Sequence, residues 1–294
     1  MSDSTPPNAD SLVVALSAQG VADVTLNRPL VRNAYDEHLV GLLHDAFRDL
    51  SKTPGVRAIV LQGAGTHFCA GADITWMRRA ATFREDENLA DAKRIAAMFQ
   101  QLHSLPLPTI ALVQGACLGG GVGLVAACDV VIAGRDAQFG LTEVRIGLTP
   151  SVISPYVVAA MGPRQAQRYL LTGERFSAAR AHGIGLVHEL VDDETGLRQA
   201  RDQVVAAVLA SCPSAVAATK ALTARASWSH IDDAVSHKTA AHSAAMRVAA
   251  DGREGMQAFL ERRRPSWFAT EHQGAAFGDE RSPGMNTSSE RERK

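Results

Sequence analysis

The chain has 294 residues, of which 46% are hydrophobic, enough for one large globular domain or for a domain with a helical appendage. Its 30 basic and 31 acidic side chains give a formal net charge of −1. No Lys or Arg run dominates a face, so the composition predicts neither a nucleic-acid partner nor an acidic membrane.

The cysteines and the N-terminus exclude further classes. The four cysteines form no C-x-x-C pair and have no histidine at metal-ligand spacing, which argues against a structural zinc or a disulfide framework. We expect them to be small buried residues of a cytoplasmic protein. The first ten residues lack the apolar run of a signal peptide, and no stretch reaches the roughly 18 apolar residues that span a bilayer.

The N-terminal third alternates β-rich and helical patterns. Leu12 to Leu16 and Val21 to Leu26 predict an opening hairpin, because short apolar runs flank a Gln-Gly turn. Asp36 is expected to cap a helix that runs to about Leu50, with apolar residues at helical spacing. Val56 to Leu61 then predicts a buried strand.

The same order recurs further along. Helical structure is expected from Asp73 to Ala80 and from Glu85 to Leu105, where two prolines end it. Thr109 to Val113 predicts a second buried strand, Gly120 to Ala127 a short central helix that is apolar all round, and Val130 to Ala133 a returning strand. This recurrence predicts an α/β core of repeated ββα-like units.

The C-terminal third is predicted to be nearly all helix, in four Ala-rich segments: 197–210, 214–226, 231–250 and 253–263. After these segments the composition turns to Gly, Ser, Asp, Glu and Arg, which is typical of disorder. The predicted organisation is a flexible N-terminus at 1–10, a core at 11–196, a helical region at 197–267 and a disordered tail at 268–294.

Two turns rich in small residues carry the chemistry. Phe68 to Ile74 and Gly115 to Gly121 can each direct a backbone N–H into one site, and each leads into a helix whose N-terminal dipole favours negative charge. Two such donors form an oxyanion hole, which predicts a reaction on an acyl group.

These turns resemble the crotonase superfamily of enoyl-CoA hydratases and isomerases, whose patterns read F-x-A-G-A-D-[IL] and G-x-x-x-G-G-G. Four further segments match the family in order, so the resemblance spans roughly residues 11 to 268. They are Leu26 to Ala34, Cys128 to Gly140, Thr172 to Ala178 and Glu254 to Arg263.

The resemblance implies a crotonase (ClpP-like) spiral of ββα units with C-terminal helices that assemble a homotrimer, often paired into a hexamer. It implies an acyl-CoA substrate and no metal or redox cofactor, since coenzyme A is part of the substrate. The N–H groups of Ala72 and Gly120 would hold the thioester oxygen, and Glu143 would transfer the proton. Contacts to CoA and substrate would come from Ala70, Ala72, Asp73, Ile74, Gly120, Phe259 and Arg262.

Gly123 departs from the family pattern. Ordinary enoyl-CoA hydratases have a second glutamate there, so this chain has one carboxylate where two are usual. Gly147 to Val158 resembles bacterial methylglutaconyl-CoA and isohexenylglutaconyl-CoA hydratases, which favours hydration of a branched glutaconyl-type acyl-CoA in leucine or isoprenoid catabolism. A delta-3 to delta-2 enoyl-CoA isomerase, which needs one base, is the alternative, and a non-catalytic acyl-CoA-binding homologue is another. Gly123→Glu is expected to raise activity on crotonyl-CoA if the helix has room.

Several polar side chains near the turns could serve either in the site or as ordinary structural residues. Arg78, Arg79 and Arg145 are candidates to pair with a substrate carboxylate, although each also fits a surface charge. His67 precedes the first turn and is expected at a strand edge or facing CoA. Asp73 is expected mainly to cap the following helix.

Overall fold

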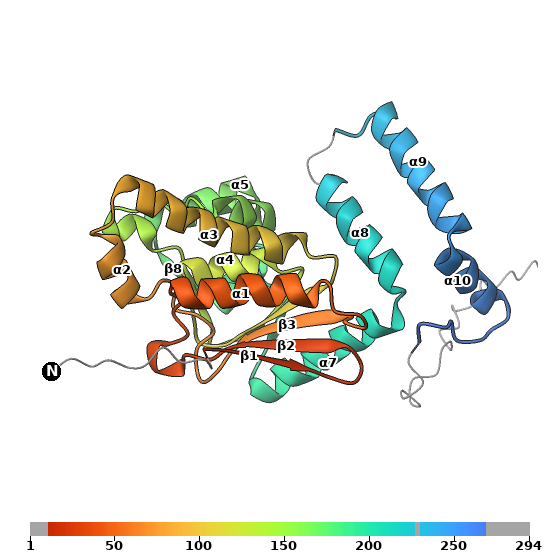
Figure 1. The fold of residues 1–294 in the computed structure, drawn as a ribbon, viewed down its shortest axis with the longest axis horizontal. Coiled ribbons are helices and arrows are strands. Elements are labelled where there is room, and N and C mark those ends of the chain that lie inside the picture. Colours follow the sequence, from red (N-terminus) through yellow and green to blue (C-terminus); the bar gives the residue numbers. More distant parts are fainter. Residues whose placement is uncertain (1–10, 227–229, 269–294) are drawn as a thin grey trace, which may run out of the picture.

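The computed structural model describes residues 11–226 and 230–268 (Figure 1). The predicted flexible N-terminus and nearly all of the predicted tail lie outside the described residues. The main sheet has six strands in the order β1-β2-β3-β4-β6-β9, and only β1 is antiparallel to its neighbour. Its strands are β1 (Leu12–Leu16), β2 (Val21–Leu26), β3 (Ala58–Gly63), β4 (Thr109–Val113), β6 (Val130–Gly134) and β9 (Glu189–Val191).

A second, three-stranded sheet lies beside the glycine turns. It consists of β5 (Ala116–Leu118), β7 (Gln138–Gly140) and β8 (Arg175–Ser177), with β7 in the middle. Strand β5 runs parallel to β7, and Leu118 pairs with Gly140. The sequence patterns did not predict this sheet, because three-residue strands contain too few positions to show a periodicity.

Helices cover both faces of the main sheet, as Figure 1 shows. On one face lie α1 (Glu37–Leu50), α3 (Glu85–Ser104) and α4 (Gly120–Ala127), whose apolar residues form the larger core cluster with the sheet. The other face is covered by α7 (Glu194–Ala210), where Leu197, Val205 and Leu209 pack on Val60 and Ile110. The first of the four predicted C-terminal helices therefore belongs to the packing of the sheet.

The remaining helical elements connect these layers. They are η1 (Pro29–Val31), α2 (Ile74–Ala80), η2 (Glu143–Ile146), α5 (Ser154–Thr172) and α6 (Ala178–Gly183). The predicted hairpin, the Asp36 cap and the central helix are confirmed: the Asp36 carboxylate accepts from the Leu39 N–H, and nearly every α4 residue is buried. Helix α5 was not predicted, since Gly162 and Pro163 interrupt its pattern.

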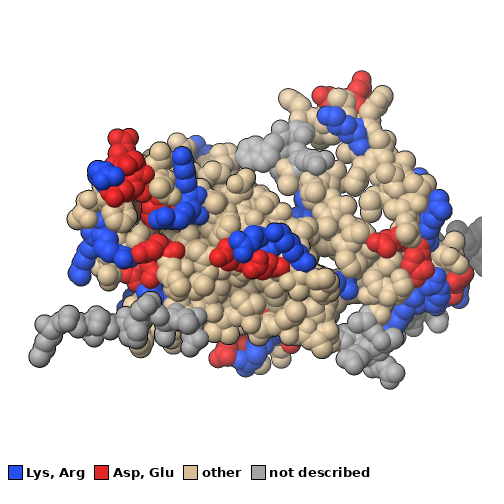
Figure 2. All heavy atoms as spheres, in the orientation of Figure 1, with Lys and Arg blue, Asp and Glu red and all other residues tan. Residues whose placement is uncertain are grey.

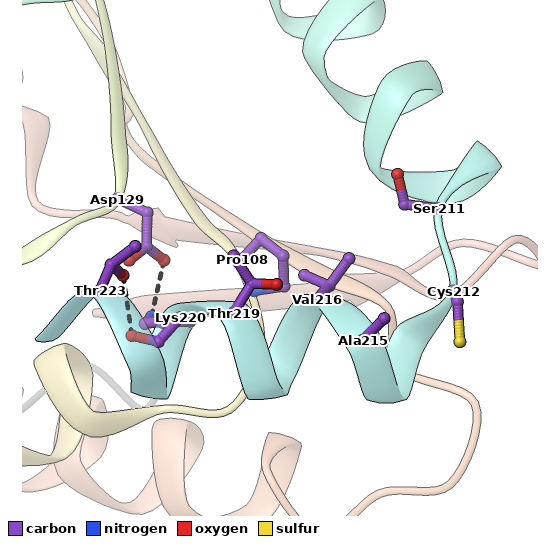
Figure 3. A pocket seen from close by; sticks show the side chains of 9 residues that line it. All are labelled: Pro108, Asp129, Ser211, Cys212, Ala215, Val216, Thr219, Lys220 and Thr223. Carbon is purple, nitrogen blue, oxygen red and sulfur yellow. Dashed lines mark hydrogen bonds and ion pairs between the residues drawn. The ribbon is translucent and has the colours of Figure 1, made fainter. Parts of the chain in front are cut away.

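The last three helices extend away from the sheet (Figure 1). They are α8 (Pro213–Ala226), α9 (Asp233–Val248) and α10 (Ala250–Leu260). The Lys220 ammonium on α8 donates to the Asp129 carboxylate at 2.6 Å and to the Leu107 carbonyl at 3.1 Å. Figure 3 shows this ion pair in the wall of an open pocket of about 520 Å³ between α8 and the core. The pocket contains no residue of the two glycine turns.

Surface charges are mixed. In the face drawn in Figure 2, acidic and basic side chains lie next to one another and form no large patch of one sign. Among the described residues no single helix is long and apolar enough to cross a membrane; α7 and α8 meet that test only as a pair, across a bend of 107°.

Candidate active site

The two predicted turns lie against each other. The Leu118 N–H donates to the Cys69 carbonyl at 2.9 Å, and the Cys69 N–H donates to the Ala116 carbonyl at 3.0 Å. A methyl group on Gly71 would lie 3.0 Å from the Leu118 carbonyl oxygen, so only glycine permits this approach, and its φ of +93° also favours glycine. Long-range pairing thus brings segments almost fifty residues apart to one place.

Each turn presents one backbone donor without a partner. On the first turn, Tyr35 pairs with the residues on either side of Ala72: its N–H donates to the Gly71 carbonyl and its carbonyl accepts from the Asp73 N–H, both at 2.9 Å. This pairing leaves out the Ala72 N–H. The N–H of Gly120, the first residue of α4, is likewise unused, and neither group donates to any atom of residues 11–226 or 230–268. The N-terminus of α4 adds a positive partial charge.

Glu143 lies beside the second turn because of the small sheet. The Gly119 N–H donates to the Gly140 carbonyl at 2.8 Å, which fixes the end of β7, and Glu143 begins η2 three residues later. Its Oε1 would lie 3.3 Å from a methyl group on Gly119, whose φ is +51°. The carboxyl group is therefore held against the turn that provides the Gly120 donor.

The Glu143 carboxyl group is available for proton transfer. Its Oε2 atom is buried and has no hydrogen-bond partner in the described part of the chain. Burial raises the pKa of Glu143 above its ordinary value, although a hydrogen bond with its own backbone offsets part of that rise. A carboxyl group with a raised pKa close to two unpaired donors is suited to general acid–base chemistry on a bound acyl group.

The position of the missing second glutamate is filled by apolar side chains. A methyl group on Gly123 would lie 2.3 Å from Ile153 Cγ2 and 3.0 Å from Phe99 Cε1. The condition attached to Gly123→Glu, room in the short helix, is therefore not met, because a glutamate would displace the buried Ile153. The sequence could not reveal this contact, since Ile153 comes thirty residues later.

Comparison with known proteins identifies the family. The family model described as "Enoyl-CoA hydratase/isomerase" matches residues 17–270. The chain belongs to the enoyl-CoA hydratase/isomerase family. It is accordingly an enzyme of the enoyl-CoA hydratase type that acts on acyl-CoA.

Relatives and solved structures of this family match most of the hydratase/isomerase chain. A Thermus thermophilus protein named as an enoyl-CoA hydratase is 34% identical over 245 residues, covering 83% of this chain and 96% of its own. A mevalonyl-coenzyme A hydratase from Aspergillus fumigatus is 30% identical over 270 residues, covering 91% and 98%. The crystal structure of an enoyl-CoA hydratase from Shewanella pealeana superposes with a TM-score of 0.84 at 38% identity, covering 87% and 96%. The crotonase fold is thereby confirmed.

The predicted CoA contacts on the first turn lie close to the two donors. Asp73 caps α2 through its carboxylate, which accepts from the Thr75 N–H at 2.7 Å, and it also forms an ion pair with Arg28 at 3.0 Å. The cap was predicted, whereas the ion pair was not. Ala70 is half-buried, and its N–H donates to the Arg32 carbonyl at 2.9 Å. Ile74 is exposed, as a residue that contacts a ligand can be.

Phe259 and Arg262 are not brought to this site within one chain. Phe259 is on α10, which stands apart from the sheet in Figure 1, and its side chain is 82% exposed. Arg262 follows the end of α10 with a φ of +55°. A role for either residue at the site requires a neighbouring copy of the chain.

The other polar candidates take ordinary positions. The Nδ1 atom of His67 accepts from the Ala116 N–H at 3.0 Å, so this imidazole joins the two turns. Arg79 forms an ion pair with Glu37 on α1, whereas Arg78 and Arg145 are exposed. Among the described residues, no group of three or more His, Cys, Asp or Glu side chains is arranged to hold a metal ion.

Sequence reasoning missed two residues of the site. Tyr35 lies between the turns and contacts Gly120, but an aromatic residue after Asn-Ala gives no signal of its own. Asp91 is a buried carboxylate on α3 that accepts from Arg94 at 2.8 Å, and its charge contributes to the raised pKa of Tyr35. A charged residue on the apolar face of a predicted helix is the signal that could have identified it.

Proposed function

We propose that this hydratase/isomerase adds water to an α,β-unsaturated acyl-CoA of the branched glutaconyl type, with Glu143 as the one protein carboxyl group that transfers the proton. The Ala72 and Gly120 N–H groups are proposed to bind the thioester oxygen. The observation that carries the proposal is the buried, unpaired Glu143 Oε2 beside the Gly119-Gly120 turn.

One carboxylate is sufficient for the proposed addition. Glu143 accepts a proton from water while the water oxygen bonds to the β carbon and the C=C electron pair moves to the thioester oxygen. The two N–H groups stabilise the resulting enolate, in which the oxygen carries the negative charge. Glu143 then returns its proton to the α carbon, so the net change is the addition of one water molecule. The raised pKa of Glu143 makes its carboxylate a stronger base, which favours the first transfer, from water to Glu143.

Two points bear on the proposal of a branched acyl group. The space next to Gly123 is apolar, which leaves no second carboxylate to act on a short linear substrate. The similar Aspergillus fumigatus protein is named for mevalonyl-coenzyme A, whose acyl group is itself branched. The missing second carboxylate supports a substrate other than crotonyl-CoA, whereas a Syntrophomonas wolfei relative that is also 30% identical is named crotonyl-CoA hydratase.

A substrate carboxylate would need a cation near the site. Arg145 is two residues after Glu143 on η2, and Arg78 is on α2 after the first turn; both guanidinium groups are exposed. We expect Arg145→Gln to raise KM for 3-methylglutaconyl-CoA by up to about fivefold and to leave KM for crotonyl-CoA unchanged, since an exposed ion pair contributes at most about 1 kcal/mol. Equal changes in both KM values would remove Arg145 from the proposal.

The decisive experiment is a substrate panel. We expect rapid hydration of 3-methylglutaconyl-CoA, slower hydration of crotonyl-CoA, and little isomerisation of a 3-enoyl-CoA, each followed by absorbance and product chromatography. Faster isomerisation than hydration would favour the isomerase, for which a single base suffices. Absence of turnover on all three, with tight binding, would favour a non-catalytic acyl-CoA-binding protein.

We also propose that the enzyme is cytoplasmic and that it is a trimer or a dimer of trimers. Helix α9 has no buried residue, and Phe259 and Leu260 on α10 are strongly exposed, as expected for surfaces that a second copy covers. Such a copy would bring Phe259 and Arg262 to a neighbour's CoA. Sedimentation of the full chain and of a chain ending at 268 should give the same trimer or hexamer; a stable active monomer would contradict the assembly.

A further inference from the structure

Tyr35 connects the two backbone donors of the site. Its main chain is paired with Gly71 and Asp73, the residues that flank Ala72. Its side chain reaches the other turn: a methyl group on Gly120 would lie 1.9 Å from the Tyr35 hydroxyl oxygen and 2.4 Å from Cε1. The hydroxyl group therefore rests directly against the main chain of Gly120.

The ring of Tyr35 is held in this position. The residue is only 6% exposed, and its ring centre lies 6.2 Å from that of Trp76 on α2. Two backbone hydrogen bonds fix one end of the residue and ring packing fixes the other. The hydroxyl group is thus preorganised and requires little reordering when a ligand binds.

The hydroxyl group itself has no hydrogen-bond partner in residues 11–226 and 230–268. Buried tyrosine hydroxyls usually find one. The other deeply buried tyrosine, Tyr169, follows that rule, because the Arg180 Nε–H donates to its oxygen at 2.9 Å. The Tyr35 oxygen is not among the fully enclosed side-chain atoms without a partner in the described part of the chain, so a bound ligand can reach it.

The phenol is a donor under ordinary conditions. Burial raises the pKa of Tyr35 well above its usual value, and the nearby Cys69, Glu143 and Asp91 raise it further. A neutral phenol donates one hydrogen bond and does not repel the negative charge that develops on an enolate oxygen.

We propose that the Tyr35 hydroxyl is a third hydrogen-bond donor to the thioester oxygen, next to the N–H groups of Ala72 and Gly120. The inference rests on the proposed function in that the ligand is an acyl-CoA. Tyr35 would strengthen carbonyl polarisation in a site where Gly123 contributes no polar side chain.

The test uses Tyr35→Phe, which removes the hydroxyl group and keeps the ring that packs on Gly120 and Trp76. Tyr169→Phe is the matched control, since it removes a buried hydroxyl that is already paired with Arg180. Butyryl-CoA labelled with ¹³C at the carbonyl is bound to the full-length protein, and the C=O stretching frequency is measured by difference infrared spectroscopy. Exchange of its α protons with deuterated water is followed in the same samples.

We expect the C=O frequency to rise toward its value in free butyryl-CoA in Tyr35→Phe and to match wild type in Tyr169→Phe. We expect α-proton exchange to fall by about tenfold or more in Tyr35→Phe, somewhat less than for loss of a main oxyanion donor, with little change in the Kd of butyryl-CoA. Wild-type frequency and exchange in Tyr35→Phe would overturn this inference alone. Failure of wild-type protein to bind both butyryl-CoA and 3-methylglutaconyl-CoA would overturn the proposed function with it.

Discussion

Two glycines of helix α4, Gly120 and Gly123, show how one glycine-rich helix serves two purposes. At its start, Gly120 has an unpaired N–H and contacts the hydroxyl of Tyr35. One turn later, a methyl group added to Gly123 would meet the apolar side chains of Ile153 and Phe99 first. The first glycine leaves room beside a polar site, whereas the second lets another element pack closely. Glycine is therefore required for the polar site at position 120 and for close packing at position 123.

The largest effect is expected for a substitution of Gly123. Gly123→Glu would place a carboxylate where Ile153 Cγ2 is 2.3 Å from the first added carbon, so overpacking and burial of a charge should destabilise the fold by more than about 4 kcal/mol. Denaturant unfolding or the soluble yield measures this. Gly41→Glu on the exposed side of α1 is the control, because nothing lies within 4 Å of its added carbon. A well-folded Gly123→Glu enzyme would show that Gly123 is not required for packing.

At the polar site beside Gly120, Glu143→Gln should lower turnover on the true substrate by about 10² or more, because it removes the proton-transfer group. Affinity for butyryl-CoA should change little, since the two N–H donors remain. Glu174→Gln, which alters an exposed carboxylate paired with Arg168, should keep wild-type turnover. Steady-state kinetics and a binding titration separate the two quantities. Near wild-type turnover in Glu143→Gln would redirect the search for a base to Asp73, His67 or the substrate's own carboxylate.

The contact between Gly120 and Tyr35 can be measured as a coupling. Gly120→Ala should destabilise the fold because the added carbon overlaps the phenol, and Tyr35→Ala should destabilise it by leaving a cavity. In the double variant the overlap is gone. Its loss of stability should therefore be smaller than the sum of the single losses by about 0.5–3 kcal/mol, as determined by denaturant unfolding. Additive losses would mean that Tyr35 moves away from Gly120 without cost.

The smallest effect concerns pH. Since burial raises the folded-state pKa of Glu143, the folded state binds this proton more tightly than the unfolded state does. The stabilisation is complete below the unfolded pKa and is lost as pH rises through the folded pKa. Relative to Glu143→Gln, wild type should thus lose stability with rising pH above the ordinary glutamate range, in paired thermal unfolding series. A constant difference across pH would indicate that the carboxyl group is solvated.

The sequence by itself determined the chemistry that depends on local patterns. Asp36 and Asp73 cap helices because their carboxylates reach N–H groups two or three residues away, and the small residues of both turns are required by the chain's own geometry. These features involve neighbours along the chain, so they could be read from order and spacing. The second sheet and α5 could not, because three-residue strands and a helix interrupted by Gly162 and Pro163 lack a readable period.

Only the tertiary structure decided what surrounds each glycine. Gly123 is a packing contact because Ile153 lies beside it. Gly120 has a polar neighbour because Tyr35, 85 residues earlier in the sequence, lies beside it. The burial that raises the pKa of Glu143 likewise depends on how elements far apart in the sequence pack around it. Such contacts arise when strands far apart in sequence pair, so no local pattern encodes them, although the residues that make them are all present in the sequence.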